Sequence, residues 1–286
     1  IQKYAVAIAL FFIPGVVFWT SGIQKETLVI GALSIAIAIT LNIGHKVQKP
    51  GIINLGLIIF LCYTSLMIKF YFVAVLFPAL FAYILALKIS GHSELNLKNS
   101  GIYLLSFVLL LYLATFSNPY LTLDGIAHSI YNNYLATLES SAYRNVFIFE
   151  GLRPDLASML RHAPEALIIG LFRPFFTDVQ WGLPAIAAIE YFFISILAIG
   201  KIAQVFISKI KSAKLILLPA ITYIVITAVL VSIASPNWGT LYRYKAGFIP
   251  FFLILILHDN PLINVFVQRF YKKMPIKDSV SSPVVK

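Results

Sequence analysis

The sequence has few charged residues and almost no cysteine. Charged side chains make up 12% of the 286 residues, whereas an ordinary soluble domain carries about 25%. The single cysteine, Cys62, excludes a disulfide within the chain and argues against a cysteine-ligated metal. The five histidines are scattered, and the sequence contains no zinc signature, phosphate-binding glycine loop or nucleophile elbow. We therefore predict no cofactor and no metal site, and the need for a divalent metal stays open.

Hydrophobic residues, in contrast, are abundant. They make up 60% of the chain, and the mean hydropathy is +0.89. A soluble fold could not hide this much apolar surface in one core, so the solvent for most of the chain must be lipid.

Eight apolar runs have the length, or nearly the length, of a membrane span. They cover residues 4–20, 27–43, 51–68, 70–88, 101–117, 182–200, 214–233 and 246–258. The third and fourth are separated only by Lys69 and should form a tight helical hairpin or a kinked pair. The first contains Pro14 and lacks a cleavage site, so we interpret it as a span rather than a signal peptide. Because the chain begins with Ile1 rather than Met, we expect its natural start to lie upstream.

The net charge of +11 bears on orientation. Lys and Arg of short loops gather on the cytoplasmic side of a membrane. Placing the lysine-rich loop 201–214 in the cytoplasm puts most basic residues of the other short loops there too, along with both chain ends. We predict an all-α integral membrane protein with about eight transmembrane helices. It divides into five spans (1–117), an extracytoplasmic loop (118–181), three spans (182–268) and a cytoplasmic basic tail (269–286).

The long loop between the fifth and sixth spans should fold as short amphipathic helices on the outer membrane surface. Apolar residues recur at helical spacing over Leu123–Leu138. Asp155 can cap a short helix that runs through Arg161, and Pro164 can begin another. The run Ala166–Phe172 is too short to span and fits an interfacial or re-entrant helix.

Arginine is sorted to the outer face in this topology. The outer arginines are Arg144, Arg153, Arg161, Arg173 and Arg243. A guanidinium is a planar fork that binds phosphate or carboxylate through two hydrogen bonds. The sequence therefore indicates a site for a lipid-linked phosphate. The alternative is that each arginine pairs with a nearby carboxylate, as Asp178 could with Arg173.

Two further segments bring polar groups to the same face. Residues 18–26 carry Trp19, Lys25 and Glu26, and residues 237–245 carry Asn237 and Arg243. Trp19 can be an aromatic-belt anchor or a ligand contact. Glu26 can be a solvated helix start, or a carboxylate that orients or deprotonates a hydroxyl.

Glu190 is an acid well inside a predicted span. Such a carboxylate is a functional candidate by default, and the alternative is a structural partner such as a Tyr or Ser on another helix.

Residues 14–26 resemble a "P-x-x-x-F-W-S-S-G-x-x-K-E" turn, with Thr20 in place of the first serine. This turn is typical of bacterial multi-spanning proteins of surface-polysaccharide biosynthesis, related to GT-C-type glycosyltransferases and polysaccharide polymerases. Residues 171–175, 189–190 and 239–244 are similar to other short patterns in those proteins. The first outer loop of GT-C enzymes usually carries an acidic residue or an acidic pair, and here it offers only Glu26.

The resemblance implies an enzyme of the bacterial inner membrane. It would transfer a glycosyl unit from a polyprenyl-phosphate-linked donor to a glycan or other hydroxyl acceptor at the outer face. Glu26 would be catalytic, and the substrate-binding residues would be Lys25, Arg153, Arg161, Arg173, Arg243, Trp19 and Asn237. An O-antigen-type polymerase or ligase, a transporter or flippase without covalent chemistry, and a scaffold subunit are the alternatives. Nucleic-acid binding is disfavoured, because the basic tail lacks interleaved aromatics.

Overall fold

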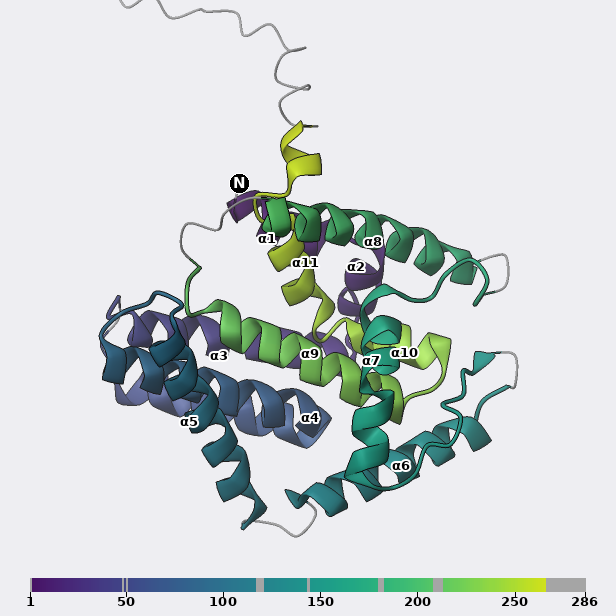
Figure 1. Cartoon of the computed structure of the whole chain (residues 1–286), viewed down its shortest axis with the longest axis horizontal. Helices are drawn as coiled ribbons and strands as arrows, with labels where there is room; N and C mark the ends of the chain where they lie inside the picture. The colour runs from purple at the N-terminus through teal and green to yellow at the C-terminus, as the bar shows by residue number, and fades with distance from the viewer. Residues whose placement is uncertain are drawn as a thin grey trace, which may run out of the picture.

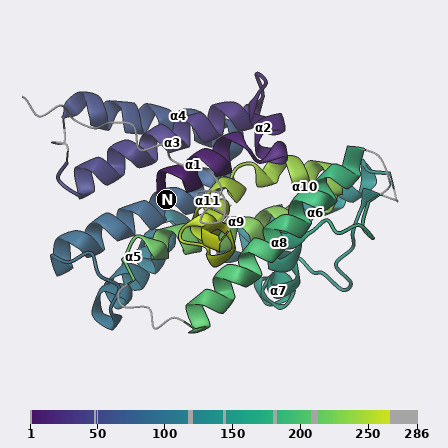
Figure 2. The ribbon, with the colours of Figure 1, turned by 90° about the horizontal axis from the view of Figure 1, so that it is seen from above.

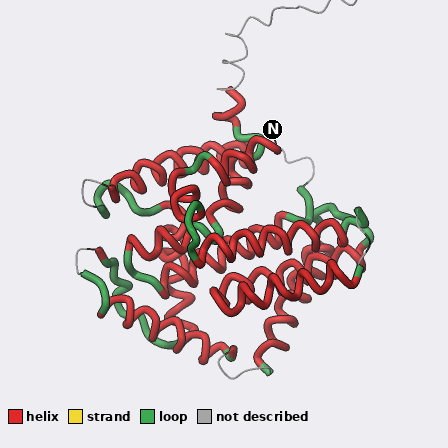
Figure 3. The backbone as a smooth tube through the Cα atoms, turned by 180° about the vertical axis from the view of Figure 1, so that it is seen from behind, coloured by secondary structure: helices red, strands yellow, loops and turns green. Residues whose placement is uncertain are grey.

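The computed structural model describes residues 2–47, 49, 51–116, 121–142, 145–179, 183–207 and 213–265. These residues are largely helical and contain no β-strand, only two isolated β-bridges (Figure 3). The helices are α1 (Gln2–Phe11), α2 (Pro14–Thr20), α3 (Lys25–Gly44), α4 (Ile52–Ser90), α5 (Leu97–Thr115), α6 (Leu123–Glu139), α7 (Leu156–Phe172), α8 (Leu183–Ile207), α9 (Leu217–Ala234), α10 (Trp238–Lys245) and α11 (Ile249–Leu257). The predicted all-α fold is confirmed. Arg144 and the predicted tail 269–286 lie outside the described residues.

Five of these helices are long and apolar enough to cross a membrane. They are α3, α4, α5, α9 and the segment Pro184–Ile207 of α8. The pair α10 and α11, bent by 62°, gives a sixth if it is one span. Large apolar side chains on these helices face outward; Leu105 is 73% exposed and Ile59 is 68% exposed. Such surfaces suit lipid, and the chain is a multi-pass membrane protein by this composition.

The first predicted span is not one continuous helix. The helix α1 ends at Phe11, and α2 begins at Pro14. Proline has no N–H to donate and its ring clashes with the preceding turn, so it favours the first position of a new helix. With 10 and 7 residues, neither piece alone has the roughly 20 residues that a span requires.

The helix α4 is broken at Lys69, whose φ of −148° and ψ of 77° are not helical. In a straight helix Leu55 and Ile84 would lie about 44 Å apart, yet both line one groove beside Ile43 of α3. The two halves of α4 therefore fold back on each other, with Lys69 at the turn. The break expected at this residue is present.

The helices sort toward two ends of the molecule. In Figures 1 and 2, α3, α4 and α5 lie on one side, and α2, α6, α7 and α10 gather at the other end. Between them, α9 contacts α4, α6, α7, α10 and α11. The helix α7 crosses α9 and approaches it closely, because Gly170 has no side chain where a Cβ would lie 2.9 Å from the carbonyl oxygen of Ala228.

Within the long loop, the helix expected from the periodicity of 123–138 is present as α6. Asp155 caps α7, since its Oδ1 accepts a hydrogen bond of 2.7 Å from the Ser158 N–H. The prediction that a second helix begins at Pro164 is wrong, because α7 runs through this proline to Phe172. Burial of Ala166 and Ile169 in the bundle stabilises the continuous helix more than the proline destabilises it.

Candidate functional site

A cavity of about 490 Å³ lies where α2, the long loop, α8 and α10 meet. Its lining is mainly aromatic and aliphatic with a few polar groups, and comprises Pro14, Phe18, Trp19, Asn145, Pro174, Asp178, Val179, Pro184, Ile186, Ala187, Asn237, Trp238, Gly239 and Tyr242. We call it the Trp19 cavity. The three segments predicted to lie on the outer face all contribute to it.

The long loop is fastened to the start of α10 at one wall of the Trp19 cavity. Asn237 caps α10, because its Oδ1 accepts a hydrogen bond of 3.0 Å from the Thr240 N–H. Its Nδ2 donates to the Ser141 Oγ at 2.9 Å. The Phe147 N–H donates to the Pro236 carbonyl at 3.1 Å. The side chain of Asn237 thus holds two segments of the wall together.

Trp19 packs edge-on against Tyr242, with ring centroids 6.4 Å apart. The indole Nε1 of Trp19 is buried and has no hydrogen-bond partner among the described residues. A buried donor without a partner costs about 1–3 kcal/mol. An acceptor oxygen that reached the Nε1 would remove this cost.

Glu190 lies behind Tyr242 and joins three helices. Its Oε2 accepts hydrogen bonds from the Tyr242 hydroxyl at 3.0 Å and from the Gly15 N–H at 2.6 Å. Glycine is required at position 15, because a Cβ there would lie 2.3 Å from the Tyr242 hydroxyl oxygen. Glu190 therefore has a tyrosine partner on another helix, as expected if its role is structural.

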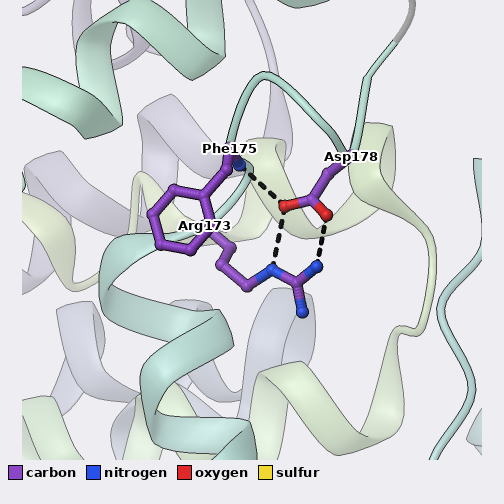
Figure 4. Close-up of polar contacts among 3 residues, drawn as sticks. All are labelled: Arg173, Phe175 and Asp178. Carbon is purple, nitrogen blue, oxygen red and sulfur yellow. Dashed lines mark hydrogen bonds and ion pairs between the residues drawn. The ribbon is translucent and has the colours of Figure 1, made fainter.

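Arg173 and Asp178 form a two-point ion pair at the edge of the cavity (Figure 4). The Arg173 Nε donates to Asp178 Oδ2 at 2.8 Å, and its Nη2 contacts Oδ1. The Phe175 N–H also donates to Oδ2, at 2.7 Å. The guanidinium carbon lies 5.1 Å from the Trp238 ring centroid. The local carboxylate expected for Arg173 is present, and Asp178 itself lines the cavity.

Lys245 is a buried cation that was not among the site residues predicted from the sequence. Only 1% of it is exposed. Its Nζ donates to the Ile169 carbonyl at 2.9 Å and to the Arg173 carbonyl, and lies 4.0 Å from the Tyr191 ring centroid. Lys245 thereby fixes α10 to the end of α7, directly before the Arg173–Asp178 pair. The sequence signal that could have identified Lys245 is its position between Tyr244 and the apolar run 246–258.

Glu26 is part of a second polar cluster, which we call the Glu26 cluster and which also contains Lys69, Arg243 and Tyr244. The buried Glu26 carboxylate lies 3.4 Å from Arg243 Nε and 3.6 Å from Lys69 Nζ. The Lys69 Nζ is 3.4 Å from the Tyr244 ring centroid. Glu26 does not line the Trp19 cavity, so the geometry gives it a role in joining α3, α4 and α10. Lys69 was missed as a site residue because it was interpreted only as the turn of the hairpin.

The remaining predicted site residues lie apart. Lys25, Arg153 and Arg161 are exposed, and none lines the Trp19 cavity. The Arg153 backbone N–H donates to the Ser158 Oγ at 2.9 Å. Of the four arginines predicted for the outer face that the structure describes, Arg173 lies at the edge of the cavity, paired with Asp178, and Arg243 belongs to the Glu26 cluster.

The residues that the structure describes contain no group of three His, Cys, Asp or Glu side chains arranged to hold a metal ion. Comparison of the chain with protein-family models, curated proteins and solved structures finds no match. The site must therefore be interpreted from its own chemistry.

Proposed function

We propose that the protein binds the glycosyl unit of a polyprenyl-phosphate-linked donor in the Trp19 cavity and transfers it to a hydroxyl acceptor. This reaction would take place at the outer face of the bacterial inner membrane, in the assembly of cell-envelope polysaccharide. The proposal is supported by the kind of groups that the cavity assembles. Aromatic rings such as Trp19 and Trp238 suit the C–H faces of a sugar ring, and Asn145 and Asp178 suit its hydroxyls.

The unpartnered indole N–H of Trp19 is the observation that carries the proposal. The Nε1 is buried and Trp19 lines the cavity, so a sugar oxygen that displaces the atoms covering this N–H would accept its hydrogen bond. Binding such an oxygen exchanges an unsatisfied donor for a satisfied one, which favours a ligand rich in hydroxyls over a purely apolar ligand.

The transfer step assigns complementary roles to Asp178 and Arg173. The acceptor oxygen attacks the anomeric carbon, the bond from that carbon to the phosphate oxygen breaks, and Asp178 receives the hydroxyl proton. Arg173 holds the Asp178 carboxylate in position through their two-point ion pair. Asp178 takes the role first assigned to Glu26, because Asp178 lines the cavity and Glu26 does not.

Binding of a polyprenyl-phosphate-linked sugar to the purified protein, followed by native mass spectrometry, tests this proposal. Trp19→Phe keeps the ring and removes the donor, and we expect it to weaken binding about tenfold, or ~1.4 kcal/mol. Tyr112→Phe, which removes a polar hydrogen from an exposed ring on α5, is the matched control and should bind as the wild type does.

Asp178→Asn separates binding from chemistry. It should retain most of the binding and lose turnover at least a hundredfold, since removing a general base costs about 10²–10⁴ in rate. Equal binding by wild type and Trp19→Phe would show that the sugar does not occupy the cavity, and the proposal would be abandoned.

A further inference from the structure

A second hollow lies between α3 and the two halves of α4. It is a groove of about 230 Å³, and the residues along its length include Ala36, Ile43, Leu55, Cys62, Val73 and Ile84. The hydroxyl of Thr40, which also lines it, donates to the Ala36 carbonyl at 2.7 Å within α3. The surface offered to an occupant is therefore hydrocarbon.

The groove has a buried floor and an open rim. Leu33 and Val73 on the floor are 2% and 3% exposed. Ile59 and Phe81 on the rim are 68% and 51% exposed. All four belong to helices long and apolar enough to cross a membrane. The groove thus opens sideways between helices that are able to cross a membrane, and its walls suit a hydrocarbon chain.

The Glu26 cluster lies at the end of the groove where α4 turns. Glu26 precedes Leu33 by about two helical turns, and Lys69 precedes Val73 by about one turn. Two cations, Lys69 and Arg243, share a single carboxylate there, so this end of the groove is positive. The Arg243 side chain is 39% exposed and remains accessible to an anion.

Tyr71 provides an independent indication of a ligand at this end. Its hydroxyl is buried and has no hydrogen-bond partner among the described residues. Its ring lies 5.7 Å from the Lys69 Nζ and 6.3 Å from the centre of the Tyr244 ring. A phosphate between Lys69 and Arg243 would accept hydrogen bonds from both cations and from the Tyr71 hydroxyl.

We propose that this groove and the Glu26 cluster hold the polyprenyl phosphate part of the donor, with one isoprenoid chain in the groove and the phosphate against Lys69 and Arg243. The inference rests on the proposed function for the nature of the lipid. A groove of about 230 Å³ with a positive end suits one chain with an anionic head, whereas a phospholipid could place only one of its two chains there. The helix α10 connects the two sites, because Tyr242 lines the Trp19 cavity and Arg243 belongs to the cluster.

Cys62 provides a built-in reporter, since it lines the groove and is the single cysteine of the chain. The rate at which a membrane-permeant maleimide modifies Cys62 in the purified protein should fall at least fivefold when polyprenyl phosphate is added. Polyprenol, which has the chain without the phosphate, and phosphatidylglycerol, which has a phosphate and two chains, should protect much less at the same concentration.

The cations are tested by Lys69→Gln and Arg243→Gln, each of which should lose most of the protection by polyprenyl phosphate. Arg243 is partly exposed, so its variant provides the test if Lys69→Gln fails to fold. Lys46→Gln, at the opposite end of α3, is the matched control and should be protected as the wild type is.

Three results would overturn the inference: no protection by polyprenyl phosphate, equal protection by polyprenol, or equal protection by phosphatidylglycerol. If Trp19→Phe weakens sugar binding while Cys62 stays unprotected, the lipid chain lies elsewhere and the proposed function stands. If Cys62 is protected while Trp19→Phe binds normally, the lipid site stands and the glycosyl site is wrong.

Discussion

Lys245 shows how one residue fixes the geometry of the Trp19 cavity from outside it. Its ammonium is enclosed by carbonyl oxygens of Ile169 and Arg173 and by the Tyr191 ring. Lys245→Met keeps most of the length of the side chain and leaves both carbonyls without this donor. Hydrogen bonds to charged groups contribute about 1.5–3 kcal/mol each, and part of that is offset by the cost of burying the charge.

We therefore expect Lys245→Met to lower the stability by about 2 kcal/mol, measured as a lower melting temperature of the detergent-solubilised protein. Sugar binding should also weaken, because the end of α7 and the Arg173–Asp178 pair lose their anchor. Lys98→Met, at an exposed lysine, controls for the loss of charge alone. A Lys245→Met protein as stable as the wild type would show that other groups satisfy the two carbonyls.

The candidate residues were only partly predictable from the sequence, and burial explains the difference. Trp19, Asn237 and Arg173 were indicated because they are polar or aromatic residues at the ends of apolar runs. Asp178 was considered only as a partner of Arg173, and Lys69 only as a turn. Their positions depend on contacts between helices distant in the sequence, which hydropathy and periodicity do not report.

At the scale of whole elements, the crossing of α7 over α9 depends on small residues. A Cβ added to Gly170 would lie 2.8 Å from the Ser232 Oγ and 2.9 Å from the Ala228 carbonyl oxygen. Gly170→Leu must push the helices apart, and overpacking of this kind costs about 1–3 kcal/mol. Gly101, on α5, has no atom within 4 Å of such a Cβ.

The expected result is a lower melting temperature for Gly170→Leu and an unchanged or higher one for Gly101→Leu, because leucine favours a helix more than glycine does. Thermal unfolding of the two purified variants, measured in the same detergent, makes the comparison. Equal losses in both would mean that the close contact between α7 and α9 does not limit the stability.

Elements were predicted well where a run was long and periodic, and less well at prolines. Proline has different effects at two positions. A new helix, α2, begins at Pro14 after the end of α1, whereas α7 continues through Pro164. Local propensity favours a helix start in both places. In α7 the packing of the buried face against α9 outweighs that preference. This packing joins residues that are distant in the sequence, such as Gly170 and Ala228, so the local sequence around Pro164 does not predict it.

At the scale of the molecule, the path through the membrane depends on the break at Lys69. A straight α4 of 39 residues would be about 58 Å long, almost twice the roughly 30 Å of a hydrocarbon core. Two halves of about 17 and 21 residues each match that core when they fold back. The hairpin returns the chain to the side from which it entered, whereas a single span would not.

Two introduced cysteines in a Cys62→Ala background distinguish these paths. Val47 follows α3 and Ile148 lies in the long loop, and both are exposed. With a hairpin, residues 47 and 148 lie on opposite sides, because α4 returns and α5 crosses once. With a straight α4 they lie on the same side. We expect an impermeant thiol reagent added to intact cells to label Ile148→Cys and to label Val47→Cys only after lysis. Labelling of both before lysis would contradict the hairpin, and with it the groove that the two halves of α4 enclose.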